Sequence, residues 1–264
     1  MKSKSCMFRF LKIMTMLAVS LAIVTGCGKI KNQDTYNKLF ETDPEFMQRH
    51  EAFAFNEVVN EAEQQLDDKT RYMTILASLI GCQGIEQYKL TLSKALDSSL
   101  TPVMAKEIVY QAVDYLGIGR VYPFLIATNE VMETKGIKLP LDGQATTTME
   151  NRREKGTEAQ MAIWGPAMKD YWKGGHINRW LAANCFGDYY TRTGLDLKQR
   201  ELITFCFLAA QGGCESQLRA HVKGNLNLGN DKSLLIKVIS QSVPYIGYPR
   251  SLNAFAIVNE IEGK

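Results

Sequence analysis

Histidine is scarce in this sequence, and the residues that usually bind metal ions or nucleotides form no recognisable pattern. The 264 residues include only 3 His, and no group of His, Cys, Asp and Glu has the spacing of a metal site. A phosphate-binding loop and the glycine-rich dinucleotide fingerprint are also absent. The sequence therefore predicts no metal ion and no cofactor.

An excess of one charge is lacking as well. The chain carries 31 Lys and Arg against 28 Asp and Glu, and four of the basic residues lie in the first 26 positions, where there is no acid. Removing those four leaves 27 basic and 28 acidic groups, so the body is nearly neutral and gives no electrostatic basis for binding nucleic acid. The composition, 45% hydrophobic and 22% charged, excludes disordered, collagen-like and multi-span membrane proteins.

The first 26 residues are typical of an export signal. Residues 1–12 are basic, and the apolar run Ile13–Val24 is shorter than the roughly 20 residues that span a bilayer. It leads into Thr25-Gly26-Cys27, an ending that resembles a bacterial lipobox. We therefore predict a lipoprotein signal peptide over 1–26, lipidation of Cys27 and a polar tether over 27–35. Gly28, rather than Asp, after the lipidated residue favours the periplasmic side of the outer membrane in the cell envelope.

The rest of the sequence predicts helices. Apolar residues recur at helical spacing, and start and stop signals such as Thr101-Pro102 and Gly117 separate the segments. No run of alternating apolar and polar residues lies between paired turn signals, so strands are not supported. The helices expected are Lys69–Ile80, Gln87–Leu96, Pro102–Leu116, Tyr122–Met132 and Lys198–Gln211, and the second unit begins with Gly156–Lys173 and an entry segment, Ile177–Tyr190.

The two halves of the chain repeat each other. Leu66–Arg71 matches Leu195–Arg200 at an offset of 129 residues, and at an offset of 130 Gln87, Gln111, Tyr115 and Gly117 match Gln217, Gln241, Tyr245 and Gly247. Matches that keep a nearly constant offset along the two halves indicate a duplicated helical unit. We predict a first unit over 36–135, a linker over 136–150 and a second unit over 151–264, each long enough to bury a core of its own.

One helix of the second unit gathers the residues best suited to chemistry. Gly212 and Gly213 end the preceding helix, and at about 100° per residue Cys214, Gln217 and His221 share a face of the next one. A thiol in the first helical turn meets the positive end of the helix dipole, which favours the thiolate. His221 could relay a proton through water or Gln217, an arrangement that suits a nucleophilic or peroxide-reactive cysteine. The alternative is a buried, unreactive Cys214 and a His221 with no chemical role.

The second half resembles the carboxymuconolactone decarboxylase family, and the first half resembles it more weakly. The segments that carry the resemblance are Arg200–Thr204, Gly213–His221, Gly224–Asn227 and Gln241–Asn253. The resemblance implies an all-α fold, here a tandem duplicated helical bundle of the carboxymuconolactone decarboxylase and alkylhydroperoxidase D-like type. It also implies a homo-oligomer, for which we expect a trimer.

The family has a decarboxylating branch and a peroxide-reducing branch with a Cys-x-x-Cys-x-x-x-His site and a Glu on the preceding helix. Cys214 and His221 match the first Cys and the His, Gln217 replaces the second Cys, and Glu201 is an approximate match for the acid. In the first half Gly84 and Thr91 stand in place of Cys214 and His221, so we expect the active site in the second unit.

Three functions remain open on this basis. The first is a thiol-dependent peroxidase that uses Cys214 and His221. Cys206 would be strained as a resolving partner and Cys82 and Cys185 remain open, and with no obvious resolving cysteine the enzyme would need an external thiol reductant. The second is a decarboxylase-like or lactone-acting enzyme that depends on His221, with a small organic acid as substrate. The third is a scaffold or small-ligand binder without catalysis.

Overall fold

The computed structural model describes residues 31–261, and the side chains from residue 34 onward. Cys27, the export signal and the first part of the predicted tether lie outside the described residues. The last part of that tether is not an irregular segment, because helix α2 already begins at Lys31.

The described chain is all helical, which confirms the expected fold class, and no strand occurs between residues 31 and 261. The first half contains α2 (Lys31–Thr42), α3 (Pro44–Ala52), the π-helix η1 (Phe53–Glu57), α4 (Val58–Asn60), α5 (Asp68–Gly81), α6 (Ile85–Ser98), α7 (Pro102–Leu116) and α8 (Ile118–Thr134). The second half contains α9 (Arg152–Trp164), the 3-10 helix η2 (Pro166–Gly174), α10 (His176–Trp180), the π-helix η3 (Leu181–Tyr190), α11 (Leu197–Gln211), α12 (Glu215–Asn227), α13 (Lys232–Ile246) and α14 (Tyr248–Glu260).

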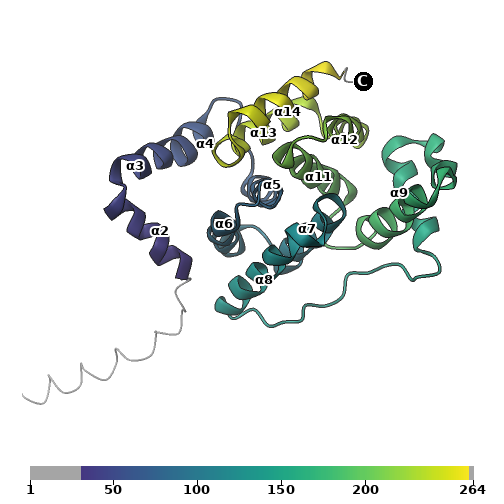
Figure 1. Ribbon diagram of the computed structural model, residues 1–264, viewed down its shortest axis with the longest axis horizontal. Coiled ribbons are helices and arrows are strands. Elements are labelled where there is room, and N and C mark those ends of the chain that lie inside the picture. The colour runs from purple at the N-terminus through teal and green to yellow at the C-terminus, as the bar shows by residue number, and fades with distance from the viewer. Residues whose placement is uncertain (1–30, 262–264) are drawn as a thin grey trace, which may run out of the picture.

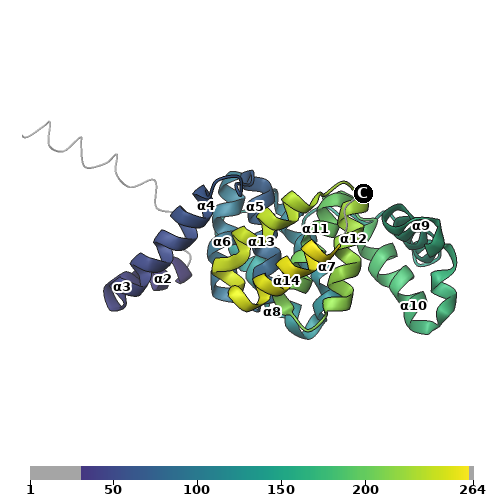
Figure 2. The same ribbon diagram turned by 90° about the horizontal axis from the view of Figure 1, so that it is seen from above.

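The helices form a central bundle with an arm at either end. Figure 1 shows α5 and α11 in the middle, surrounded by α6, α7, α8, α12, α13 and α14. The arm of α2 to α4 and the arm of α9 to η3 lie at opposite ends, as the view from above also shows (Figure 2). No helix within the described residues is long and apolar enough to cross a membrane.

The helix boundaries repeat at the offset seen in the sequence. The four helices α5 to α8 begin at residues 68, 85, 102 and 118, and α11 to α14 begin at 197, 215, 232 and 248. The caps repeat too, because Asp67 and Asp196 each accept a hydrogen bond from a backbone N–H in the first turn. Gly117 and Gly247, with φ of 76° and 78°, make the same tight turn after α7 and α13.

The two repeats share one core rather than burying a core each. A single cluster of buried apolar side chains joins α5 to α8 with α11 to α14. At the crossing of α5 and α11, a Cβ on Gly81 would lie 2.7 Å from Ala210 Cβ and 2.9 Å from Phe207 O. Only glycine permits this approach, which fixes the first repeat against the helix that precedes Cys214.

A buried ion pair connects α7 to α11. Arg200 is fully buried, and its guanidinium donates to the Glu107 carboxylate at 3.0 Å and to Gln111 Oε1 at 2.9 Å. Gln111 donates in turn to Arg200 O and to Thr204 Oγ1, both at 2.9 Å. Because buried charges are tolerated only when they are paired and hydrogen-bonded, this network sets the register of α7 against α11.

In the arm of the second half, the segment Gly156–Lys173 with which the second unit begins does not form one continuous helix. Helix α9 ends at Trp164 because Gly165 has a φ of 90° and Pro166 follows it, and the chain continues as the 3-10 helix η2. The arm is tightly packed on itself: a Cβ on Gly156 would lie 1.8 Å from Ala182 O, so α9 and η3 cross at a glycine. Residues 136–150 connect α8 to this arm without a helix.

Candidate active site

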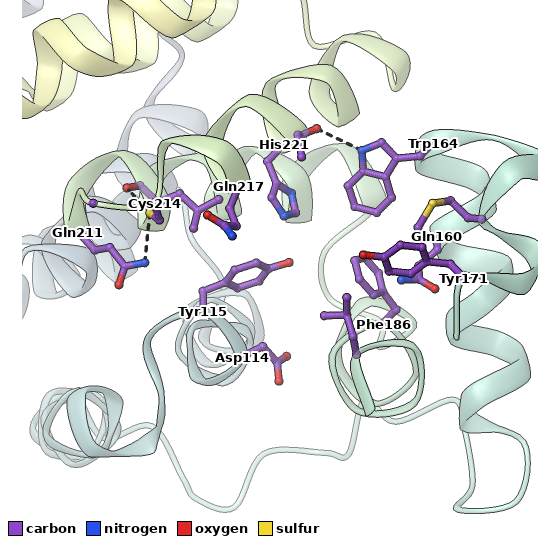
Figure 3. Close-up of a pocket in the computed structure, with 15 residues that line it drawn as sticks. Asp114, Tyr115, Gln160, Trp164, Tyr171, Phe186, Gln211, Cys214, Gln217 and His221 are labelled. Atoms are coloured by element: carbon purple, nitrogen blue, oxygen red, sulfur yellow. Dashed lines mark hydrogen bonds between the residues drawn. The ribbon is translucent and has the colours of Figure 1, made fainter. Parts of the chain in front are cut away.

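A cavity of about 730 Å³ opens where the arm of the second half meets the bundle. Its wall combines residues from α7, α9, η2, η3, α11 and the first two turns of α12, and Figure 3 shows their side chains converging on it. Cys214, Gln217 and His221 all line this cavity, as their helical spacing indicates. Its volume lies within the range of pockets that hold small organic ligands.

The most defined polar feature of the cavity is a pair formed by His221 and Glu201. His221 Nδ1 lies 2.8 Å from Glu201 Oε2, and the two side chains come from the adjacent helices α12 and α11. Glu201 is completely buried, and His221 is 8% exposed. Glu201, the approximate match for the family's acid, is thus in direct contact with the histidine.

Two further residues hold the Glu201 carboxylate. Tyr190 donates its hydroxyl hydrogen to Glu201 Oε1 at 2.8 Å. A Cβ on Gly224 would lie 2.6 Å from Glu201 Oε2, so glycine at this position of α12 makes room for the carboxylate. The site therefore requires Gly224, which the sequence analysis noted only as part of a family segment.

The backbone around the pair is clamped as well. Asn225, fully buried, donates to Glu201 O at 3.0 Å and to His221 O at 2.8 Å. Trp164 donates its indole N–H to Ala220 O at 3.2 Å and packs edge-on against the His221 ring. These contacts hold α9 and α12 together and leave the imidazole little freedom to turn, which preorganises it for a reaction.

The hydrogen bond to Glu201 decides which nitrogen of His221 is reactive. With a carboxylate as acceptor, Nδ1 carries the proton and Nε2 is the free base. Nε2 has no hydrogen-bond partner among the described residues, while the ring lines the cavity. His221 can therefore accept a proton from a molecule in the cavity, and Glu201 stabilises the imidazolium that results.

The thiol of Cys214 does not have the environment that the sequence suggested. Cys214 is the residue before α12, with φ of −138°, and its thiol donates to Leu208 O at 3.5 Å and accepts from Gln211 Nε2 at 3.4 Å. Burial raises the pKa of this thiol, the Gln211 hydrogen bond opposes the rise, and nearby Glu215 adds to it. The expectation of a thiolate favoured by the helix dipole is wrong, because the thiol points back to α11 instead of to the free N–H groups of α12.

Gln217 lies at the mouth of the cavity and makes no contact that would relay a proton. Its Oε1 accepts a hydrogen bond from neighbouring Ser216 at 2.8 Å, and its side chain is exposed. Cys82, Cys185, Cys206 and Cys214 are all free thiols. Cys206 is buried in the core, where burial raises its pKa to about 12, so it is no partner for an oxidised Cys214.

Sequence reasoning missed the part of the wall that comes from outside α12. Tyr115 from α7 contacts the His221 ring edge-on and shares a hydrogen bond with Tyr190 at 2.7 Å. Asp114, next to it, and Gln160 from α9 also line the cavity. The one available signal was the repetition of Tyr115 as Tyr245, which the sequence analysis used only to establish the repeat.

Two of these polar groups lack partners. The amide nitrogen and oxygen of Gln160 are buried without a hydrogen bond, and so is Asp114 Oδ2. Burial raises the pKa of Asp114 to about 7, contact with the Cys185 thiol opposes the rise, and Asp188 adds to it. Asp114 therefore takes up a proton near neutral pH, unlike an ordinary carboxyl.

The equivalent place in the first half is nearly filled. It is a cavity of about 70 Å³ lined in part by Tyr72, Thr91 and Tyr245. At the repeat offset Tyr72 and Thr91 stand where Glu201 and His221 stand in the second half. This place in the first half therefore has neither an acid nor a histidine at the positions that correspond to Glu201 and His221. No group of three potential metal ligands gathers anywhere in the described part of the chain.

Comparison with known proteins points to one family. Residues 176–260 match the model of the carboxymuconolactone decarboxylase family. A solved structure of a Burkholderia xenovorans protein named as a gamma-carboxymuconolactone decarboxylase subunit is similar, with 21% sequence identity and a TM-score of 0.46 over 85% of this chain and 89% of that one. No curated protein matches the sequence significantly.

Proposed function

We propose that the chain, whose residues 176–260 match the model of the carboxymuconolactone decarboxylase family, is an enzyme in which His221 transfers a proton on a small organic molecule bound in the cavity. The observation that carries this proposal is the buried contact of 2.8 Å between His221 Nδ1 and Glu201 Oε2, with Nε2 left free at the cavity. A positioned histidine supported by a carboxylate is a common acid–base arrangement.

An unsaturated lactone illustrates the reaction that this geometry allows. His221 Nε2 removes a proton from the carbon beside the carbonyl, and the electron pair of that C–H bond moves into the carbonyl system. The imidazolium, stabilised by Glu201, then returns the proton to the far carbon of the conjugated system. The double bond has moved, no atom is gained or lost, and His221 is restored.

The test uses α-angelica lactone, a small neutral lactone whose isomerisation needs only such a proton transfer. We expect the full-length chain in detergent to catalyse the isomerisation, and His221→Asn to reduce the rate by about two to four orders of magnitude, the usual contribution of a general base. Cys214→Ser should leave the rate within about twofold, because the thiol is protonated and bonded to α11.

Carbon dioxide release from carboxymuconolactone is measured with the same variants, to include the reaction for which the family is named. If neither substrate is turned over, or if His221→Asn retains full activity, the proposed acid–base role is wrong. Loss of activity in Cys214→Ser alone would assign the chemistry to the thiol.

A thiol-dependent peroxidase is the second candidate, favoured by the position of Cys214 in the same cavity as His221. In that reaction the thiol sulfur attacks hydrogen peroxide, water leaves, and an external dithiol reduces the resulting sulfenic acid. Peroxide consumption with dithiothreitol as reductant, abolished by Cys214→Ser, would support it. The raised pKa of the thiol predicts a slow reaction, because the thiolate is the form that attacks peroxide.

We also propose that copies of the chain associate through α8 and α14, with a trimer as the expected state. Exposed apolar residues lie on both helices, among them Ile118 and Tyr122 on α8 and Tyr248 and Leu252 on α14. Ile118 and Tyr122 correspond to Tyr248 and Leu252 at the repeat offset of 130. Light scattering of the chain, compared with a Tyr122→Glu and Leu252→Glu double variant, tests the assembly.

Attachment to the envelope is proposed to depend on lipid at Cys27. Cells that express the full chain should carry it in the membrane fraction and incorporate labelled palmitate into it. Cys27→Ala should abolish both the label and the membrane association. Labelling that persists in this variant would place the lipid elsewhere.

A further inference from the structure

We propose that the cavity beside His221 selects uncharged, flat organic molecules that carry a hydrogen-bond donor and an acceptor side by side, and that Gln160 is the residue that selects them. The inference names the substrate class of the site proposed above and in that respect rests on the proposed function. It differs from the anionic organic acid that the sequence suggested.

The first observation is the charge of the wall. No Lys or Arg from the described part of the chain lines the cavity, and its only charged group other than His221 is the carboxyl of Asp114. A carboxylate ligand would lose its hydration there, find neither lysine nor arginine and meet a second carboxyl group. Enzymes that bind carboxylates commonly supply an arginine or lysine for this purpose.

The second observation is the amide of Gln160. The side chain is fully buried in the wall, and both its Nε2 and its Oε1 lack a hydrogen-bond partner. Leaving a buried donor and a buried acceptor unpaired destabilises the protein unless a ligand completes their hydrogen bonds. Because the amide presents a donor and an acceptor together, the matching group on a ligand is an acceptor beside a donor.

The third observation is the apolar part of the wall. The rings of Trp164, Tyr171 and Phe186 lie on the same side of the cavity as Gln160, and the ring of Tyr115 lies on the other side, as Figure 3 shows. Aromatic walls favour flat ligands through stacked and edge-on contacts. A planar amide, lactam or hydroxylated enone meets all three conditions, whereas a carboxylate leaves Gln160 Oε1 unpaired and an amidinium leaves Gln160 Nε2 unpaired.

The test compares three probes of the same shape: benzamide, which is neutral, benzoate, which is an anion, and benzamidine, which is a cation. Titration calorimetry of the full-length chain in detergent should show benzamide binding at least about tenfold more tightly than either ion, the effect of one unsatisfied buried group. Gln160→Met should remove this preference, and Gln160→Glu should shift it to benzamidine. Gln48→Met, an exposed glutamine on α3 at the far end of the molecule, is the matched control.

The outcomes separate this inference from the proposed function. Benzoate binding as tightly as benzamide, or a preference that survives both Gln160 variants, would overturn the inference whatever the enzyme does. Selective binding of benzamide without lactone isomerisation would leave the inference standing and refute the acid–base role.

Discussion

Replacing Asp114 by Asn should stabilise the protein, and the gain should depend on pH. Burial raises the pKa of this carboxyl from its ordinary value of 3.8 to about 7, and its Oδ2 has no hydrogen-bond partner. Below the ordinary pKa the group is protonated in both the folded and the unfolded chain. As the pH rises toward 7 only the unfolded chain ionises, so the wild type loses stability throughout that window.

The size of the effect follows from the two pKa values. Their difference corresponds to at most about 4 kcal/mol at neutral pH, at about 1.4 kcal/mol for each pH unit. The advantage of Asp114→Asn in the free energy of unfolding should therefore grow by roughly 3 kcal/mol between about pH 4.5 and about pH 8.

Urea unfolding of the two proteins at a series of pH values measures this advantage. Asp142→Asn, which removes an exposed carboxyl between α8 and α9, is the control and should follow the wild type. An Asp114→Asn curve parallel to the wild type would show that the carboxyl is ionised without penalty. The explanation of its environment by burial would then be refuted.

Three further predictions concern the structure around the site. Gly224→Ala should displace the Glu201 carboxylate, because the new Cβ would lie 2.6 Å from Oε2. Isomerase activity should then fall at least about tenfold. Gly143→Ala is the control and should be neutral, because a Cβ there would have no neighbouring atom within 4 Å. Alkylation of the Cys214 thiol should become faster up to and beyond the ordinary thiol pKa of about 8.5, and a plateau near neutral pH would contradict the raised pKa. Glu107→Gln should lower the free energy of unfolding by about 3–5 kcal/mol, because it leaves the buried guanidinium beside it without its carboxylate; a loss below about 1 kcal/mol would show that the ion pair matters little.

Many of the helix bounds could be predicted from the sequence, because the interactions that form a helix join residues close together in the chain. The bounds of α5, α7 and α11 follow from apolar spacing and from caps such as Asp67 and Asp196, which act within one turn. The repeat was readable for the same reason, since its identities keep a fixed register along the chain. The break between α9 and η2 was not predicted, and it occurs at a glycine with positive φ, Gly165.

Only part of the candidate site could be predicted from the sequence. Cys214, Gln217 and His221 were placed on one face correctly, because positions three and seven residues apart meet on any helix. Their chemical roles stay predictions, and the ionisation of the thiol was misjudged because Leu208 and Gln211 of another helix surround it. The tight contact of Glu201 with His221 depended on the fold of α11 against α12.

The sequence by itself determined that the described chain is helical, that its two halves are related, and that residues 176–260 match the model of the carboxymuconolactone decarboxylase family. Only the tertiary structure decided that the halves share one core, that Tyr115 from the first half reaches the cavity of the second, and that Asp114 and Gln160 are left without partners there. The physical reason is the distance along the chain over which each kind of interaction acts. Helical periodicity and capping act over a few residues, whereas burial, hydrogen-bond satisfaction and pKa depend on which distant helices pack against one another.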